Sequence, residues 1–189
     1  MKRVCLLSAG VLILTVACQD NFVEPENGMT TVEKSARLEK TITLHVKGCV
    51  KAIPDNDGSV VLCSPAEAGV TVPGSGRVSG HENILGKFDP ENSTFEKEYC
   101  EFTMTPEGPV IYMNTNVILQ NMSGEKMFVK NHIWINAVNG DISGYSDVID
   151  GTGRFEGVTG SAVMMNATID PETGIGSWEE EGYITLVIK

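Results

Sequence analysis

The chain has little positive charge, few aromatic residues and few histidines. Its 189 residues include 14 Lys or Arg against 25 Asp or Glu, which gives a net charge of −11 at neutral pH. Such an acidic surface repels phosphate backbones, and no basic cluster interleaved with aromatic residues counteracts it, so nucleic acid is not an expected partner. The three histidines, His45, His81 and His132, share no metal-ligand spacing, so we expect no metal and no other cofactor.

Sequence motifs of catalysis are also missing. No serine lies in a Gly-x-Ser-x-Gly elbow, and no helix pattern follows Gly151-x-Gly153 to bind a dinucleotide. The run Glu179-Glu180-Glu181 and the pair Glu98 and Glu101 supply carboxylates, but charge runs on strands are usually solvated, and we expect that here. The sequence therefore predicts no catalytic residue and favours a protein that is not an enzyme.

The N-terminus carries an export signal. Lys2 and Arg3 precede an apolar run from Val4 to Val16, which is too short to span roughly 30 Å of hydrocarbon and is typical of a cleaved signal peptide covering residues 1–17. Cys18 directly follows the predicted cut and resembles the lipobox cysteine of bacterial lipoproteins, whose thiol receives diacylglycerol. Ordinary signal peptidase would cut the same bond and release a secreted protein, so two outcomes stay open.

Lipidation at Cys18 is the outcome that we predict. The protein would then be exported and lipid-anchored in the bacterial cell envelope, at the outer membrane on its periplasmic or surface side, with the membrane as a partner through the N-terminal lipid. Residues 18–39 are polar and acidic, without a sustained apolar period, and predict a lipidated N-terminus followed by a flexible tether. Residues 40–189 form the predicted domain. Two positive charges leave with residues 1–17, so the net charge of the mature chain becomes −13.

The domain alternates apolar and polar residues with a period of two. The alternating apolar sets are Ile42, Leu44, Val46; Ile111, Met113, Thr115, Val117, Leu119; Met127, Val129, Ile133, Ile135; Val163, Met165, Ala167, Ile169; and Ile184, Leu186, Ile188. Glycine- and asparagine-rich breaks separate them, and Asn139-Gly140-Asp141 is the clearest hairpin turn. The pattern predicts an all-β domain of eight or nine antiparallel strands that closes on itself or packs as a sandwich.

Four segments carry a resemblance to a known family: Leu85-Gly86-Lys87, Asn139-Gly140-Asp141, Gly151-Thr152-Gly153-Arg154-Phe155-Glu156-Gly157-Val158-Thr159-Gly160-Ser161 and Gly182-Tyr183-Ile184-Thr185. In this order they resemble the allene oxide cyclase barrel-like family, relatives of the plant dirigent proteins. The resemblance implies a single calycin-like, eight-stranded antiparallel barrel with a central cavity. It implies no activity, because such barrels include cyclases, dirigent proteins and secreted proteins of other kinds. The glycines of the third segment also suit a tight corner, with Phe155 as a core plug.

Three cysteines, Cys49, Cys63 and Cys100, remain in an oxidising compartment and allow at most one intramolecular disulfide. The turn signal from Asp55 to Gly58 is centred midway between Cys49 and Cys63, and a hairpin there would place these two cysteines nearly opposite each other. We predict that pair, with three free thiols as the alternative.

Two neighbouring strands carry aromatic and polar residues opposite their aliphatic faces. This possible ligand or partner surface comprises Tyr112, Asn114, Asn116, Phe128, His132 and Trp134. If the aliphatic face fills the core, the surface points outward and suggests a contact site; in the reverse arrangement it lines a lumen; packing beneath the tether or a loop is the third alternative.

The sequence thus predicts a non-catalytic binding or accessory module for a small apolar ligand, a glycan or an envelope protein. The alternative is a cyclase or isomerase acting on an apolar substrate in the lumen, for which His132 or Glu98 would have to point into a closed cavity.

Overall fold

The computed structural model describes residues 40–56, 58–170 and 173–188. The predicted signal peptide, Cys18 and the tether lie outside these residues. The strands are β1 (Lys40–Pro54), β2 (Val60–Leu62), β3 (Thr71–Pro73), β4 (Ser75–Glu82), β5 (Gly86–Lys87), β6 (Thr94–Thr105), β7 (Gly108–Gln120), β8 (Lys126–Asn136), β9 (Ile142–Gly151), β10 (Thr159–Ile169) and β11 (Gly176–Ile188). Two 3-10 helices, η1 (Ala66–Ala68) and η2 (Gly153–Phe155), complete the described elements.

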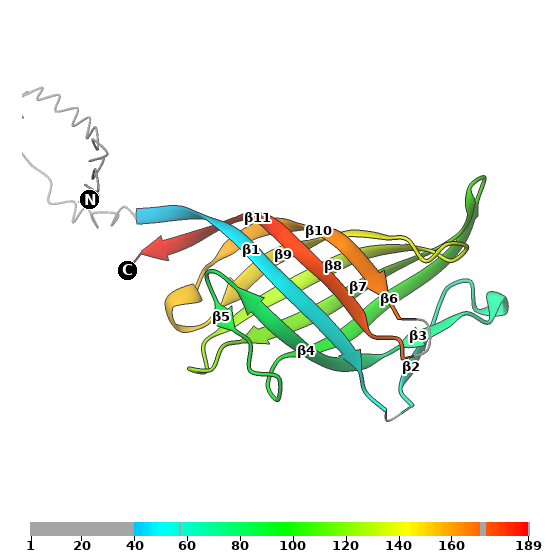
Figure 1. Cartoon of the computed structure of the whole chain (residues 1–189), viewed down its shortest axis with the longest axis horizontal. Coiled ribbons are helices and arrows are strands. Elements are labelled where there is room, and N and C mark those ends of the chain that lie inside the picture. The colour runs from blue at the N-terminus through cyan, green and yellow to red at the C-terminus, as the bar shows by residue number, and fades with distance from the viewer. Residues whose placement is uncertain (1–39, 57, 171–172, 189) are drawn as a thin grey trace, which may run out of the picture. The chain divides into compact units, whose positions relative to one another are not determined.

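Eight strands close into an antiparallel barrel (Figure 1). The hydrogen-bonded order is β1-β11-β10-β9-β8-β7-β6-β4, and β4 pairs with β1 to complete the ring. The short β5 pairs with β4, while β2 and β3 form a separate two-stranded sheet. The predicted all-β, eight-stranded antiparallel barrel is therefore confirmed.

Alternation along the strands separates the lumen from the outer wall. On β7, Met113, Thr115 and Val117 are buried, whereas the residues between them are more exposed. β10 differs from the predicted alternation, because Ala162 and Met164 are buried and Val163 is 59% exposed. Its apolar residues occupy both faces, so hydrophobicity alone did not show which face points inward.

One end of the barrel is filled by side chains. Leu85, Phe88, Met127, Phe155, Val158 and Ile184 are almost fully buried there and belong to one core cluster. η2 inserts Phe155, which has no exposed surface, so the predicted core plug is confirmed. β1 begins and β11 ends at this closed end, where Lys40 is paired with Ile188.

The disulfide joins Cys63 to Cys100, and Cys49 is a free, exposed cysteine. The predicted Cys49–Cys63 pair is therefore wrong, and so is the alternative of three free thiols. The hairpin that it required does not form, because β1 pairs with β11 and β4 instead of turning back on itself.

Backbone pairing explains the bond that does form. Ser64 bridges to Glu101 in parallel, with Ser64 N–H donating to Cys100 O at 2.9 Å and Phe102 N–H donating to Ser64 O at 2.7 Å. These hydrogen bonds bring Cys63 beside Cys100 on β6. Both cysteines are buried.

Candidate functional site

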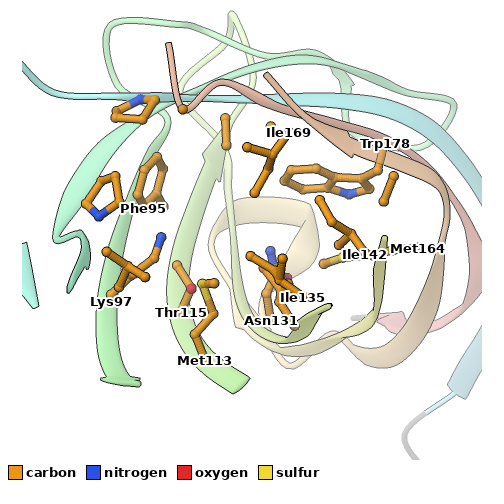
Figure 2. A pocket seen from close by; sticks show the side chains of 18 of the residues that line it. Phe95, Lys97, Met113, Thr115, Asn131, Ile135, Ile142, Met164, Ile169 and Trp178 are labelled. Atoms are coloured by element: carbon orange, nitrogen blue, oxygen red, sulfur yellow. The ribbon is translucent and has the colours of Figure 1, made fainter. Parts of the chain in front are cut away.

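The end of the barrel opposite the Phe155 plug contains a cavity of about 150 Å³. Its wall comes from all eight barrel strands and is mostly apolar: Ala52, Val78, Phe95, Met113, Val117, Ile133, Ile135, Ile142, Met164, Ile169 and Trp178 are among its lining residues. Figure 2 shows Lys97, Thr115 and Asn131 along one side of this cavity, with Ile169 and Trp178 across from them. The open half of the lumen is thus an apolar chamber with a few polar groups on one wall.

Those polar groups form a row across adjacent strands. Lys97 on β6 is paired with Thr115 on β7, and Thr115 is paired with Asn131 on β8. Directly paired residues point to the same face of a sheet, so the three side chains share the lumen. Thr115 and Asn131 are each only 4% exposed, and neither Thr115 Oγ1 nor Asn131 Oδ1 has a hydrogen-bond partner in the described part of the chain. Buried polar atoms without partners are costly, which makes this row a place where a ligand can bond.

Lys97 is the only ionisable residue that lines the cavity within the described ranges. Burial lowers the pKa of its ammonium group to about 8, because an apolar environment disfavours the charged form. Its Nζ lies 5.0 Å from the centre of the Phe95 ring. Among residues 40–56, 58–170 and 173–188, no carboxylate forms an ion pair with it.

A pair of carboxyl groups lies deeper in the lumen. Glu82 on β4 and Glu180 on β11 both flank Gly48 of β1 in the sheet. A Cβ atom on Gly48 would lie 2.7 Å from Glu82 Cγ and 3.0 Å from Glu180 Oε1, so only glycine leaves room for the two side chains to converge. Together they border a void of about 20 Å³, the size of one water molecule.

Both carboxyl groups hold their protons more tightly than in water. Burial raises the pKa of Glu82 well above its usual value, and the neighbouring charge of Glu180 raises it further. Burial also raises the pKa of Glu180. Two adjacent carboxylates in an apolar site repel each other, so the pair favours the state in which one carboxyl group keeps its proton. Val117, Asn131 and Trp178 border both this void and the cavity.

The expectation that Glu179-Glu180-Glu181 is a solvated face is wrong for its central residue. Glu180 is 6% exposed and faces the lumen. Glu181 faces outward, where its Oε1 lies 2.9 Å from both Lys47 Nζ and His45 Nε2.

All six residues of the predicted ligand or partner surface lie on the outer wall: Tyr112, Asn114, Asn116, Phe128, His132 and Trp134. They alternate with lumen residues such as Met113 and Thr115, so they do not line the cavity.

The outer residues contact one another. Tyr112 O–H donates to Asn114 Oδ1 and also lies 3.0 Å from His132 Nδ1. The Tyr112 ring centre lies 4.9 Å from that of Trp134, and the His132 ring stacks at 4.6 Å on Tyr145. These contacts form an aromatic ladder across β7, β8 and β9.

The two titratable residues proposed for a lumenal enzyme also lie outside. His132 Nε2 is 3.5 Å from Asp147 Oδ2, and Glu98 forms an ion pair with Lys130 at 2.6 Å. The titratable groups of the lumen are instead Lys97, Glu82 and Glu180, which sequence reasoning did not select.

No group of three His, Cys, Asp or Glu side chains in the described ranges is arranged to hold a metal ion. In the same part of the chain, no helix has the length and apolar character needed to cross a membrane.

Comparisons with known proteins include a distant structural likeness. No family model matches the chain, and no curated protein matches it. A solved structure of a pterocarpan synthase dirigent protein is similar at a TM-score of 0.43 and 12% identity, over 79% of this chain and 93% of that one. We draw no functional conclusion from this likeness, and the barrel assignment rests on the strand pairing described above.

Proposed function

We propose that this protein is an exported binding module that holds a small, largely apolar molecule in the open half of its barrel. The observation that carries the proposal is the cavity of about 150 Å³ with a mostly apolar wall and three unpartnered polar atoms, on Thr115, Asn131 and Trp178. Engineered apolar cavities of about this volume bind benzene, so a ligand with about one ring fits inside.

The cavity also favours binding over the accessory role that the sequence predicts beside it. A barrel that serves only as a scaffold needs a packed interior, and the closed end around Phe155 is packed in that way. Filling the other end would have required only larger side chains in place of Ala52, Ala167 or Gly176, all of which line the cavity. The small residues there favour a binding role.

For localisation we propose lipid anchoring at Cys18, which the apolar run and the cysteine after it support. The test is the mass of the mature N-terminus. Diacylglycerol on Cys18 supports the anchor, whereas an unmodified Cys18 would make the protein a secreted one and leave the binding proposal standing.

The binding proposal is tested with toluene and methyl-labelled methionine in NMR spectra. Met113 and Met164 line the cavity, whereas Met104 and Met122 are 70% and 67% exposed on loops or the outer wall and serve as internal controls. We expect toluene to shift the methyl signals of Met113 and Met164 only. Substitution of Ala52→Phe, which fills the cavity from β1, is expected to abolish these shifts. No shift at either lumenal methionine would refute the proposal.

A second candidate is an isomerase, and the Glu82–Glu180 pair favours it. A carboxylic acid that stays neutral at pH 7 can donate a proton, and its ionised partner can accept one. A suitable probe is cyclohex-3-enone, whose conversion to the conjugated isomer needs only the removal of a proton from C2 and the return of a proton at C4, and is followed by ultraviolet absorbance. Conversion that is lost in Glu82→Gln and kept in Glu181→Gln, a change on the outer wall, would support an enzyme. If the rate of conversion does not exceed the rate in buffer, the isomerase is refuted and the binding module remains the proposed function.

A further inference from the structure

We infer that the molecule bound in the lumen is a small carboxylic acid, whose carboxylate pairs with Lys97 and accepts a hydrogen bond from the Thr115 hydroxyl. This inference rests on the proposed binding function and specifies the chemical class of its ligand.

The charge inside the cavity is the first reason. The chain as a whole carries a net charge of −11, yet the only ionisable side chain in the described cavity lining is a lysine. The other charged groups of the lumen, Glu82 and Glu180, border the deeper void and form no ion pair with Lys97. Lys97 is only partly exposed, and an ammonium in such a site is costly without a counter-ion, so an anionic ligand in the cavity supplies the missing charge.

The hydrogen-bond groups beside Lys97 are the second reason. Thr115 is the direct cross-strand neighbour of Lys97, and its Oγ1 is buried without a partner. An ammonium and a hydroxyl on adjacent strands lie within reach of the two oxygens of one carboxylate. Asn131, the next residue of the row, remains available to a second polar group of the ligand.

Other ligand classes fit the same wall less well. A neutral ring would fill the apolar space and, by excluding water, leave the ammonium of Lys97 more poorly solvated than before. A cation would be repelled by Lys97. An acid with an apolar body of about one ring satisfies both the cation and the apolar residues opposite it, Ile169 and Trp178 (Figure 2).

The test compares benzoate with nitrobenzene, which has nearly the same shape and no net charge. Binding is followed by the methyl signals of Met113 and Met164 at pH 6.5. Hydrogen bonds to charged groups predict that benzoate binds at least about tenfold more tightly than nitrobenzene. This preference is expected to disappear in Lys97→Met and to persist in Lys130→Met, which removes an ammonium from the outer wall.

Two further measurements test the carboxylate inference even if Lys97→Met does not fold. Thr115→Val keeps the shape of the side chain, removes its hydroxyl and is expected to weaken benzoate binding severalfold, with little effect on nitrobenzene. In the unmodified protein, the preference for benzoate is expected to decline as the pH rises through about 8, where Lys97 loses its charge.

The outcomes separate this inference from the function on which it rests. If nitrobenzene binds in the lumen as tightly as benzoate, or if benzoate keeps its preference in Lys97→Met, the carboxylate inference is overturned and the binding proposal stands. If neither probe shifts the lumenal methionines, both fail.

Discussion

The partly buried ammonium of Lys97 is expected to destabilise the ligand-free protein at neutral pH, so replacing it with methionine should stabilise the fold. Lys97 has a pKa of about 8 in the folded chain against 10.5 for a solvated lysine. The unfolded chain therefore binds more protons between these values, and stability rises with pH across that window. Relative to a neutral side chain, the charge costs about 3 kcal/mol at pH 7, about 2 at pH 9 and about 1 at pH 10.

Guanidinium unfolding of both proteins from pH 7 to pH 10 measures this cost. Both proteins are first unfolded in denaturant and refolded, which removes any bound molecule. No reductant is added, so the disulfide stays intact. Methionine retains most of the apolar stem of lysine, so we expect Lys97→Met to be more stable by up to about 3 kcal/mol at pH 7, with a gain that shrinks as the pH rises. Lys130→Met removes a half-exposed ion pair with Glu98 and is expected to lose no more than about 1 kcal/mol, without that pH trend. A Lys97→Met protein no more stable than the parent at pH 7, or a gain that does not change with pH, would refute the reasoning.

Three further predictions concern the interior. Replacing both Cys63 and Cys100 with alanine opens a loop with a sequence separation of 37 and is expected to cost about 4 kcal/mol in denaturant unfolding, whereas Cys49→Ala should change stability by less than about 0.5 kcal/mol. The stability that protonated Glu82 contributes is present below about pH 4.5 and is lost as the pH rises through its raised folded pKa; Glu82→Gln is therefore expected to show a flatter stability profile and higher stability than the parent at pH 7. Phe155→Ala empties the plug of the closed end and is expected to cost about 3–5 kcal/mol, and a loss below about 1 kcal/mol would contradict the plug.

The barrel could be predicted because two strands show their inner face plainly. Met113, Val117 and Leu119 on one strand, and Met127, Val129 and Ile133 on the next, all fall on alternate positions, and a sheet with one apolar face must close or be covered. The same alternation also places one polar residue of the site on the inner face. Thr115 lies between Met113 and Val117, and could have been identified as a lumenal polar residue from its position alone.

Glu180 is a second residue that the pattern could have revealed. Every second residue of β11 points to the same face, and this face carries Ile184, Gly182, Glu180 and Trp178. The neighbouring acidic residues concealed this, because a run of three carboxylates is typical of a solvated strand. The partner of Glu180 could not be predicted, since Glu82 reaches it only through the ring closure of β1 with β4.

The inward direction of both Lys97 and Cys100 depends on an irregularity in β6 that cannot be recognised in the sequence. The register of β6 shifts between Lys97, paired with Thr115, and Tyr99, paired with Asn114, so that Glu98 is the extra residue of a bulge. Without the bulge, Tyr99 would face inward with Lys97, and Cys100 would face outward. The bulge instead turns Cys100 into the interior, where it meets Cys63.

The adjacency of Lys40 and Ile188 at the closed end has a practical consequence for handling the molecule. Along β1, Ala52 at the cavity lies twelve positions after Lys40, a path of about 40 Å. A bead, chip or fluorescent fusion joined next to Lys40 or Ile188 therefore lies far from the entrance and leaves it clear.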